Sequence, residues 1–132
     1  MKQRTSDWTV AAIALLGVWA ILWVSDADAQ ELITAAAAEN SRAGRYEWMQ
    51  VAVIDGPLAV DMHYLARSTF NSVLRANGFR APYRETHGFA ILRRITSTNG
   101  VVSYQCDIYL TLEASSRVME HELRHCDGWD HR

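Results

Sequence analysis

Three histidines near the end of the sequence are spaced so that they can bind one metal ion. His121 and His125 are four residues apart, so on a helix they stand one turn apart on the same face. Gly128 can end that helix in a left-handed conformation, which lets the chain turn back and bring in His131. Three neutral imidazoles and one open position make a catalytic zinc site, whereas four protein ligands make a structural one. The sequence therefore predicts a catalytic Zn²⁺ site whose metal ligands are His121, His125 and His131.

Glu122 supplies the chemical group that a structural zinc site does not need. It lies about a quarter-turn round the helix from His121, close enough to polarise a water molecule on the same ion. This position predicts that Glu122 is the general base of a hydrolytic reaction. A second group must stabilise the oxyanion. The sequence leaves it open, and Tyr104, Tyr109 and His87 are the candidates.

Residues 121–131 together read H-E-x-x-H-x-x-G-x-x-H. This stretch resembles the extended zinc-binding consensus of the metzincin metalloproteases, within the wider group of zincins. The resemblance implies three histidine ligands, Glu122 as general base, and a small sheet backed by helices. It also implies hydrolysis of peptide bonds, in a protein or in the peptide stems of cell-wall material. Metzincins carry a Met-turn after the third histidine, but only Arg132 follows His131 here, so we expect a minimal zincin-like domain.

The bulk composition fits one small domain. The chain has 132 residues, of which 49% are hydrophobic, enough for a modest core. Its formal net charge is −2, and it has no basic run of the kind that binds nucleic acid. The charge therefore predicts no nucleic-acid partner, whereas the resemblance to metzincins implies a peptide or protein substrate.

The N-terminal segment is typical of a secretory signal. Lys2 and Arg4 precede an apolar run over residues 10–24, and small residues follow at Ala27 and Ala29. We expect residues 1–29 to be a signal peptide, and residues 30–132 to form the mature domain in the periplasm or outside the cell. The alternative is an uncleaved, single-pass anchor in the inner membrane, although the run is short for a span of about twenty residues.

Local patterns predict an α+β fold with a small mixed sheet and a β-hairpin backed by helices. The C-terminal helix, beginning after Ser115 or Ser116, carries the metal-binding histidines. The other expected elements are a helix over 30–43, a strand over 46–54, a helix over 61–77 starting at Asp61, and hairpin strands over 89–97 and 102–112.

The hairpin has a predicted register as well as predicted strands. Asn99-Gly100 favours a two-residue type I′ turn. That turn sets Phe89 opposite Leu110 on the apolar face. It also sets Arg93 opposite Cys106, where a charged side chain fits poorly and would have to reach the sheet margin.

The two cysteines are expected to meet. Cys106 points to the core side of its strand and Cys126 to the sheet side of the last helix, and an exported protein folds in an oxidising compartment. We therefore predict a Cys106–Cys126 disulfide. The alternative is Cys126 as a zinc ligand, and Asp127 or Asp130 is the alternative third ligand should His131 fail to bind.

Two further readings of function do not involve catalysis. In one, the protein is an exported metal-binding protein whose histidines hold metal structurally or scavenge it. In the other, it is a small envelope assembly protein whose terminal helix docks a partner. The glutamate beside the first histidine argues against the first alternative, and the second does not explain the spacing of the histidines.

Overall fold

A computed structural model describes residues 28–38, 47–80 and 86–131, and it confirms the α+β class. The described residues form two helices and six strands. In chain order they are β1 (Ala29–Ala38), β2 (Trp48–Gln50), β3 (Leu58–Leu65), α2 (Arg67–Ala76), β4 (Gly88–Thr96), β5 (Val102–Thr111), α3 (Ser116–Cys126) and β6 (Trp129–His131).

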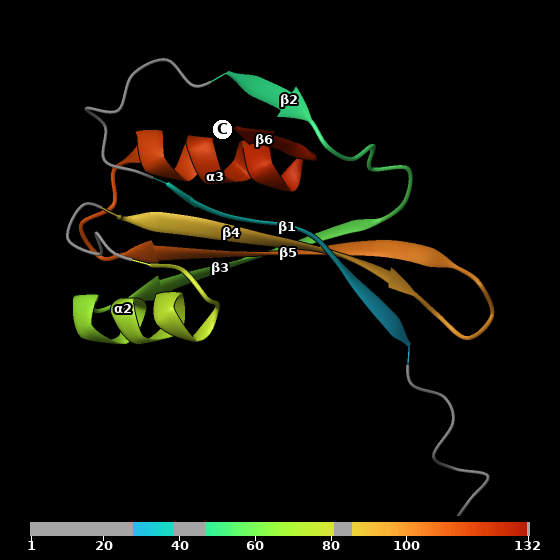
Figure 1. Cartoon of the computed structure of the whole chain (residues 1–132), viewed down its shortest axis with the longest axis horizontal. Helices are drawn as coiled ribbons and strands as arrows, with labels where there is room; N and C mark the ends of the chain where they lie inside the picture. The colour runs from blue at the N-terminus through green and yellow to red at the C-terminus, as the bar shows by residue number, and fades with distance from the viewer. Residues whose placement is uncertain (1–27, 39–46, 81–85, 132) are drawn as a thin grey trace, which may run out of the picture.

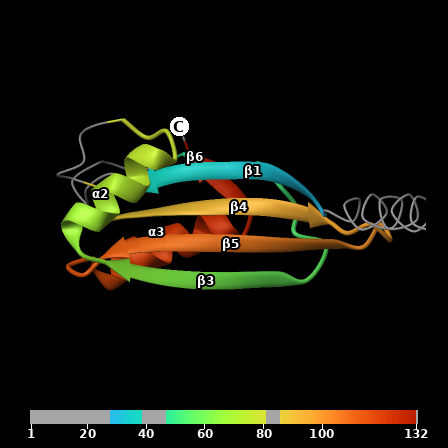
Figure 2. The ribbon, with the colours of Figure 1, turned by 90° about the horizontal axis from the view of Figure 1, so that it is seen from below.

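A four-stranded mixed sheet separates the two helices. Its strand order is β1-β4-β5-β3, in which β3 runs parallel to β5 and the other neighbours are antiparallel (Figure 2). Helix α3 covers one face of the sheet and α2 the other (Figure 1). Strands β2 and β6 form a separate two-stranded sheet beside α3. The motif helix thus lies between the large sheet and a short ribbon.

Alternating side chains of the central strands supply both halves of the core. The cluster beneath α3 consists of Ala90, Leu92, Tyr104, Cys106, Ile108, Leu110 and Cys126. The cluster beneath α2 consists of Phe70, Leu74, Phe89 and Ile91. Because β4 is buried on both faces, its even-numbered residues serve one cluster and its odd-numbered residues the other.

The hairpin between β4 and β5 is confirmed, but its turn is one residue longer than predicted. Thr96 pairs with Val102, and inside that pair the amide of Ser97 donates to the carbonyl of Val101 at 2.9 Å. The loop therefore holds three residues, 98–100. Gly100 has a φ of +81°, as expected for a three-residue loop that ends in the left-handed region.

The longer turn shifts the register by one residue and moves side chains to the other face. Phe89 pairs with Tyr109 instead of Leu110, so it packs beneath α2 and not beneath α3. Arg93 lies opposite Gln105 instead of Cys106, and its Nη1 donates to Asp107 Oδ2 at 2.7 Å. The predicted misfit of a charge against the core does not exist.

The alanine-rich segment predicted as a helix over 30–43 is strand β1 over its described part, Ala29–Ala38. It pairs antiparallel with β4, and Thr34 and Ala36 are buried on the α3 side. Small side chains there let the helix pack close above the strand. Helix propensity is a weak preference, and pairing with the open edge of β4 overrides it.

The helix predicted over 61–77 is also shorter than expected. Residues 61–65 belong to β3, which pairs parallel with β5, and α2 begins only at Arg67. Its N-cap is Ala66 and not Asp61, while the end of the helix at Ala76 agrees within one residue with the predicted end at residue 77. The spacing of the apolar residues before Arg67 is compatible with both a helix and a strand, and pairing with β5 selects the strand.

The strand predicted over 46–54 is confirmed only as β2, Trp48–Gln50. Beyond it the chain crosses the end of α3, where the amides of Val51 and Ala52 donate to the carbonyl of Gly128 at 2.9 and 3.1 Å. The amides of Val51 and Ala52 thus share one carbonyl acceptor and do not form the regular hydrogen bonds of a strand pair.

The last helix forms as expected. Ser115 is its N-cap, and its hydroxyl accepts from the amide of Val118. Cys126 belongs to the cluster under the helix, on the sheet side as predicted, and Met119 and Leu123 pack against that cluster. The histidine face of α3 therefore turns away from that cluster.

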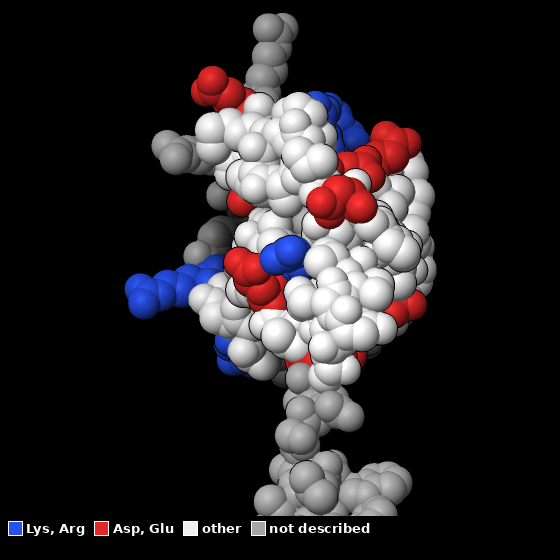
Figure 3. All heavy atoms as spheres, turned by 90° about the vertical axis from the view of Figure 1, so that its right-hand side faces the viewer, with Lys and Arg blue, Asp and Glu red and all other residues white. Residues whose placement is uncertain are grey.

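One end of the molecule shows how its charges are spread. In Figure 3, acidic and basic side chains lie among uncharged ones, without a continuous area of one sign. Such a surface exerts no strong field of one sign on a charged partner.

In the described part of the chain, neither helix has the length and apolar character needed to cross a membrane. The predicted signal segment 1–29 lies outside the described residues except for its last two.

Candidate metal centre

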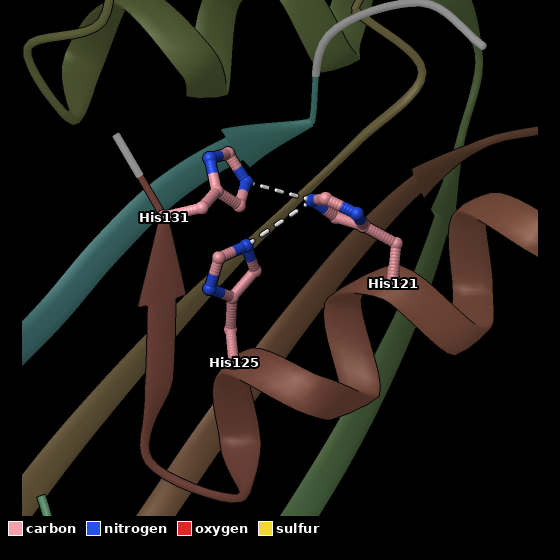
Figure 4. Close-up of side chains that lie close together, drawn as sticks. All are labelled: His121, His125 and His131. Carbon is pink, nitrogen blue, oxygen red and sulfur yellow. Dashed lines mark hydrogen bonds between the residues drawn. The ribbon is translucent and has the colours of Figure 1, made fainter. Parts of the chain in front are cut away.

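Helix α3 and strand β6 bring the three predicted ligands together. His121 and His125 project from one face of α3, and His131 projects toward them from β6 (Figure 4). The helix ends at Cys126, and Gly128 turns the chain back with a φ of +83°. One nitrogen of each imidazole lies within 4.8 Å of the other two. The structure therefore assembles the predicted histidine set.

The spacing of the nitrogen atoms suits a zinc ion. The Nε2 atom of His121 lies 3.3 Å from that of His125 and 3.0 Å from that of His131. Two nitrogens bound to one zinc at about 2.0–2.1 Å with tetrahedral angles are about 3.3–3.4 Å apart. The two separations from His121 therefore fit the ion after shifts of a few tenths of an ångström, and all three nitrogens lie within 4.8 Å of one another.

Hydrogen bonding fixes the ring of His125 in the form that a metal requires. Its Nδ1 lies 2.8 Å from the carbonyl oxygen of Trp129. A carbonyl can only accept, so Nδ1 carries the proton and donates it, which leaves the Nε2 lone pair directed at the centre. An Asp130 oxygen 3.6 Å from Nδ1 adds a negative charge behind the ring.

Asp130 lies behind the candidate centre, outside the group of three histidines that could hold an ion. One carboxylate oxygen accepts from the amide of His131 at 2.8 Å, and the other accepts from the hydroxyl of Thr34 at 3.2 Å. Thr34 is buried on β1, so this bond ties the histidine turn to the large sheet. The other alternative ligand, Asp127, is the exposed C-cap of α3.

The third histidine is held in place by the ribbon. His131 pairs directly with Trp48 across β6 and β2. At the turn, a Cβ on Gly128 would overlap the carbonyl oxygen of Ala52, so only glycine lets the two segments approach this closely. The glycine of the motif therefore provides both the positive φ and the space.

A disulfide joins Cys106 of β5 to Cys126 in the last turn of α3, as predicted. Their Cα atoms are 5.6 Å apart, within the usual range for this bond. Because the sulfur of Cys126 is bonded to Cys106, the alternative of Cys126 as a zinc ligand is excluded. The bond anchors the residue next to His125 to the central sheet.

Burial keeps His121 and His125 in their neutral, metal-binding form. Burial is the largest of the causes that lower the pKa of His121 to about 4, and the neighbouring His125, His131 and Arg124 contribute to the same shift. Burial also lowers the pKa of His125, against a smaller opposing effect of its bond to the Trp129 carbonyl. Protons therefore compete weakly for these two nitrogens near neutral pH.

Glu122 is fully buried on the sheet side of α3. Its Cγ lies 3.1 Å from the position that a Cβ on Gly88 would take, so the glycine at the start of β4 leaves room for the glutamate. The predicted general base thus lies inside the molecule, between the motif helix and β4.

Trp48 is a component of the centre that sequence reasoning missed. Its ring centroid lies 4.9 Å from that of His121, 5.2 Å from that of His125 and 5.0 Å from that of His131. The guanidinium of Arg124 also lies over the ring of Trp48, with its Cζ atom 4.6 Å from the ring centroid. No local pattern relates residue 48 to residues 121–131, because only the pairing of β2 with β6 brings them together.

The three residues considered for oxyanion stabilisation are engaged by other groups. The hydroxyl of Tyr104 donates to Asp55 at 2.6 Å. Tyr109 faces α2 and stacks on Phe89 with centroids 4.7 Å apart. Nδ1 of His87 accepts from Arg67 at 2.9 Å. The oxyanion group therefore stays unassigned.

Comparison of the chain with models of protein families, with curated proteins and with solved structures found no match.

Proposed function

We propose that this protein is an exported zinc-dependent metallopeptidase that hydrolyses peptide bonds with Glu122 as general base. The observation that carries the proposal is the convergence of three Nε2 atoms, from His121, His125 and His131, at spacings suited to one zinc ion. The resemblance of residues 121–131 to the metzincin consensus supports the choice of reaction. The disulfide is compatible with export to the periplasm or beyond the cell.

The residues of the chain divide the work in this proposal. A zinc ion bound by the three imidazoles supplies a Lewis acid that polarises a carbonyl group and acidifies water. Glu122, one residue from the first ligand, accepts the proton of the attacking water and delivers it to the leaving amine. Trp129 and Asp130 keep the ring of His125 oriented throughout.

Replacement of the base separates catalysis from metal binding. Purified protein should contain about one zinc per chain and cleave members of a peptide library. Glu122→Gln should retain the zinc and lose nearly all turnover. Glu120→Gln, a change of the same kind at an exposed site two residues away on the same helix, should retain both. Absence of zinc from the wild-type protein, together with no zinc uptake at neutral pH, would falsify the proposal.

A second candidate is an exported zinc-binding protein without catalytic activity. The complete burial of His125 and Glu122 favours it, because a structural centre needs no access for substrate. The same variants decide between the two. A binding protein would hold zinc and show no zinc-dependent cleavage in either wild type or Glu120→Gln. An envelope assembly role, the remaining alternative, predicts that removal of zinc leaves partner binding unchanged.

A further inference from the structure

Four aromatic rings surround the candidate metal centre. The centroids of the three imidazoles are 4.9–5.0 Å apart, and the Trp48 centroid is 4.9–5.2 Å from each of them. Four points with nearly equal separations stand at the corners of a tetrahedron. The indole of Trp48 therefore lies over one side of the triangle of histidines, centred on it.

From this arrangement we infer that Trp48 is the floor of the metal centre and directs the open coordination position to the opposite side. A ligand oxygen binds zinc at about 2.0–2.2 Å. A zinc ion on the indole side of the triangle would have its fourth position filled by the ring. Water or a substrate carbonyl can reach the ion only from the side away from Trp48. This inference rests on the proposed zinc site and adds a positioning residue to it.

Two further contacts hold the indole in that place. Trp48 stands directly opposite His131 in the β2–β6 ribbon, so both side chains project to the same side of it. The guanidinium of Arg124 lies 4.6 Å from the Trp48 ring and 5.5 Å from the ring of Trp129, which places a cation between two indoles. The floor is thus fixed to both elements that carry the ligands.

The segment after Trp48 strengthens the same attachment. The amides of Val51 and Ala52 both donate to the carbonyl of Gly128, and Ala52 lies against Gly128 itself. Residues 48–52 thus form a strap, defined here as the segment that crosses the turn between α3 and β6. Because the strap ends on the turn that presents His131, displacing Trp48 would also disturb the third ligand.

An apolar floor has a measurable effect on coordination. It excludes water from one side of the ion, so three imidazoles and one exchangeable ligand give a tetrahedral centre. Without the indole, water can enter from both sides and raise the coordination number. Cobalt(II) reports the difference, because tetrahedral cobalt absorbs visible light much more strongly than five- or six-coordinate cobalt.

The test uses the full-length chain, freed of metal and titrated with zinc or cobalt(II). Trp48→Ala should weaken zinc binding by about 10–100-fold, the usual loss for a group that supports metal ligands. It should also lower the visible absorption of the cobalt form. Trp48→Phe, which keeps an aromatic ring, should retain the wild-type spectrum. Trp129→Phe, which keeps the backbone carbonyl that His125 binds, is the matched control on the other side of Arg124 and should also retain it.

Acetohydroxamate checks on which side the open position lies. It should perturb the cobalt spectrum of the wild-type protein, because that position is accessible. Hydroxamate binding that appears only in Trp48→Ala would overturn the inference, since the indole would then cover the position. Wild-type zinc affinity and cobalt spectrum in Trp48→Ala would overturn it as well.

A second measurement decides the matter if Trp48→Ala does not fold. Bound cobalt should quench tryptophan emission in the wild-type protein, and Trp48→Phe should lose most of that quenching. Equal quenching in both proteins would show that Trp48 is not beside the ion. Failure of the wild-type protein to bind zinc would defeat the proposed function before any variant is made. Zinc binding with the Trp48 effect but without cleavage would leave the floor standing and defeat only the peptidase.

Discussion

The two faces of the sheet handle histidine in opposite ways. On the face of the sheet that α2 covers, Nε2 of His63 lies 3.4 Å from a carboxylate oxygen of Asp107. The His63 ring also stacks on that of Tyr109, with centroids 4.6 Å apart. Asp107 also accepts from Arg93, so the charges of this cluster compensate one another within the protein. On the α3 side, His121 has imidazole nitrogens from two other histidines within 3.3 Å.

This difference indicates what each group of residues is for. A carboxylate between two basic side chains has its charge compensated within the protein. It stabilises the fold and orients the side chains that it contacts. Three imidazole nitrogens that point at one another bring several lone pairs together, and a cation between them removes that repulsion. Proximity of a histidine to polar groups therefore does not suggest a metal site, whereas convergence of three imidazole nitrogens gives a group that could hold an ion.

The largest expected effect separates ligands from their supports. His131→Ala should weaken zinc binding by more than about 100-fold, while Asp130→Ala should cost about tenfold, as is usual for a residue behind a ligand. His63→Ala, on the other face, should leave zinc affinity unchanged. Isothermal titration with zinc measures all three. Intact affinity in His131→Ala together with its loss in Asp130→Ala would show that the aspartate is the third ligand.

The disulfide makes the α3 side of the sheet the covalently braced one. Replacing both Cys106 and Cys126 by alanine should lower the free energy of unfolding by about 2–4 kcal/mol, because the bond restricts the unfolded chain. Zinc affinity should fall as well, since Cys126 adjoins His125. Urea unfolding and zinc titration give the two numbers. Two free thiols in oxidised, folded wild-type protein, detected by mass after alkylation, would contradict the pairing.

The Asp107 cluster should matter for stability alone. Asp107→Asn removes the charge that compensates Arg93 and should lower the free energy of unfolding by about 1–2 kcal/mol. Zinc affinity should stay at the wild-type value. A loss of zinc affinity as large as that of Asp130→Ala would show that the two faces are coupled and that the contrast between them is false.

The last prediction concerns the pH dependence of the metal-free protein. The pKa of His121 is about 4 in the folded chain and about 6.5 when unfolded, so below 6.5 the unfolded chain takes up a proton that the folded chain does not. Stability from this group is complete above about pH 6.5 and declines as the pH falls toward 4. Melting temperatures in chelator at several pH values measure the decline. His121→Asn should flatten the curve, and an equally steep curve in that variant would assign the effect elsewhere.

Long-range pairing explains where the sequence-based expectations were wrong. The alanines of β1 favour a helix in isolation, but the edge of β4 offers a complete set of backbone partners. The Asn99-Gly100 pair favours a two-residue turn, and one extra residue in the loop reversed the faces of β4. Neither outcome is visible in a local window, because each depends on a strand elsewhere in the chain.

By itself, the sequence determined the last helix and the set of histidines on it. The cap at Ser115, the one-turn spacing of His121 and His125, and the turn at Gly128 act within a few residues, so local stereochemistry suffices to place them. Only the tertiary structure decided that Trp48 lies against all three imidazoles and that Thr34 holds Asp130 behind them. Those contacts join segments far apart in the chain, and they exist only because strand pairing and burial bring the N-terminal segments onto the motif helix.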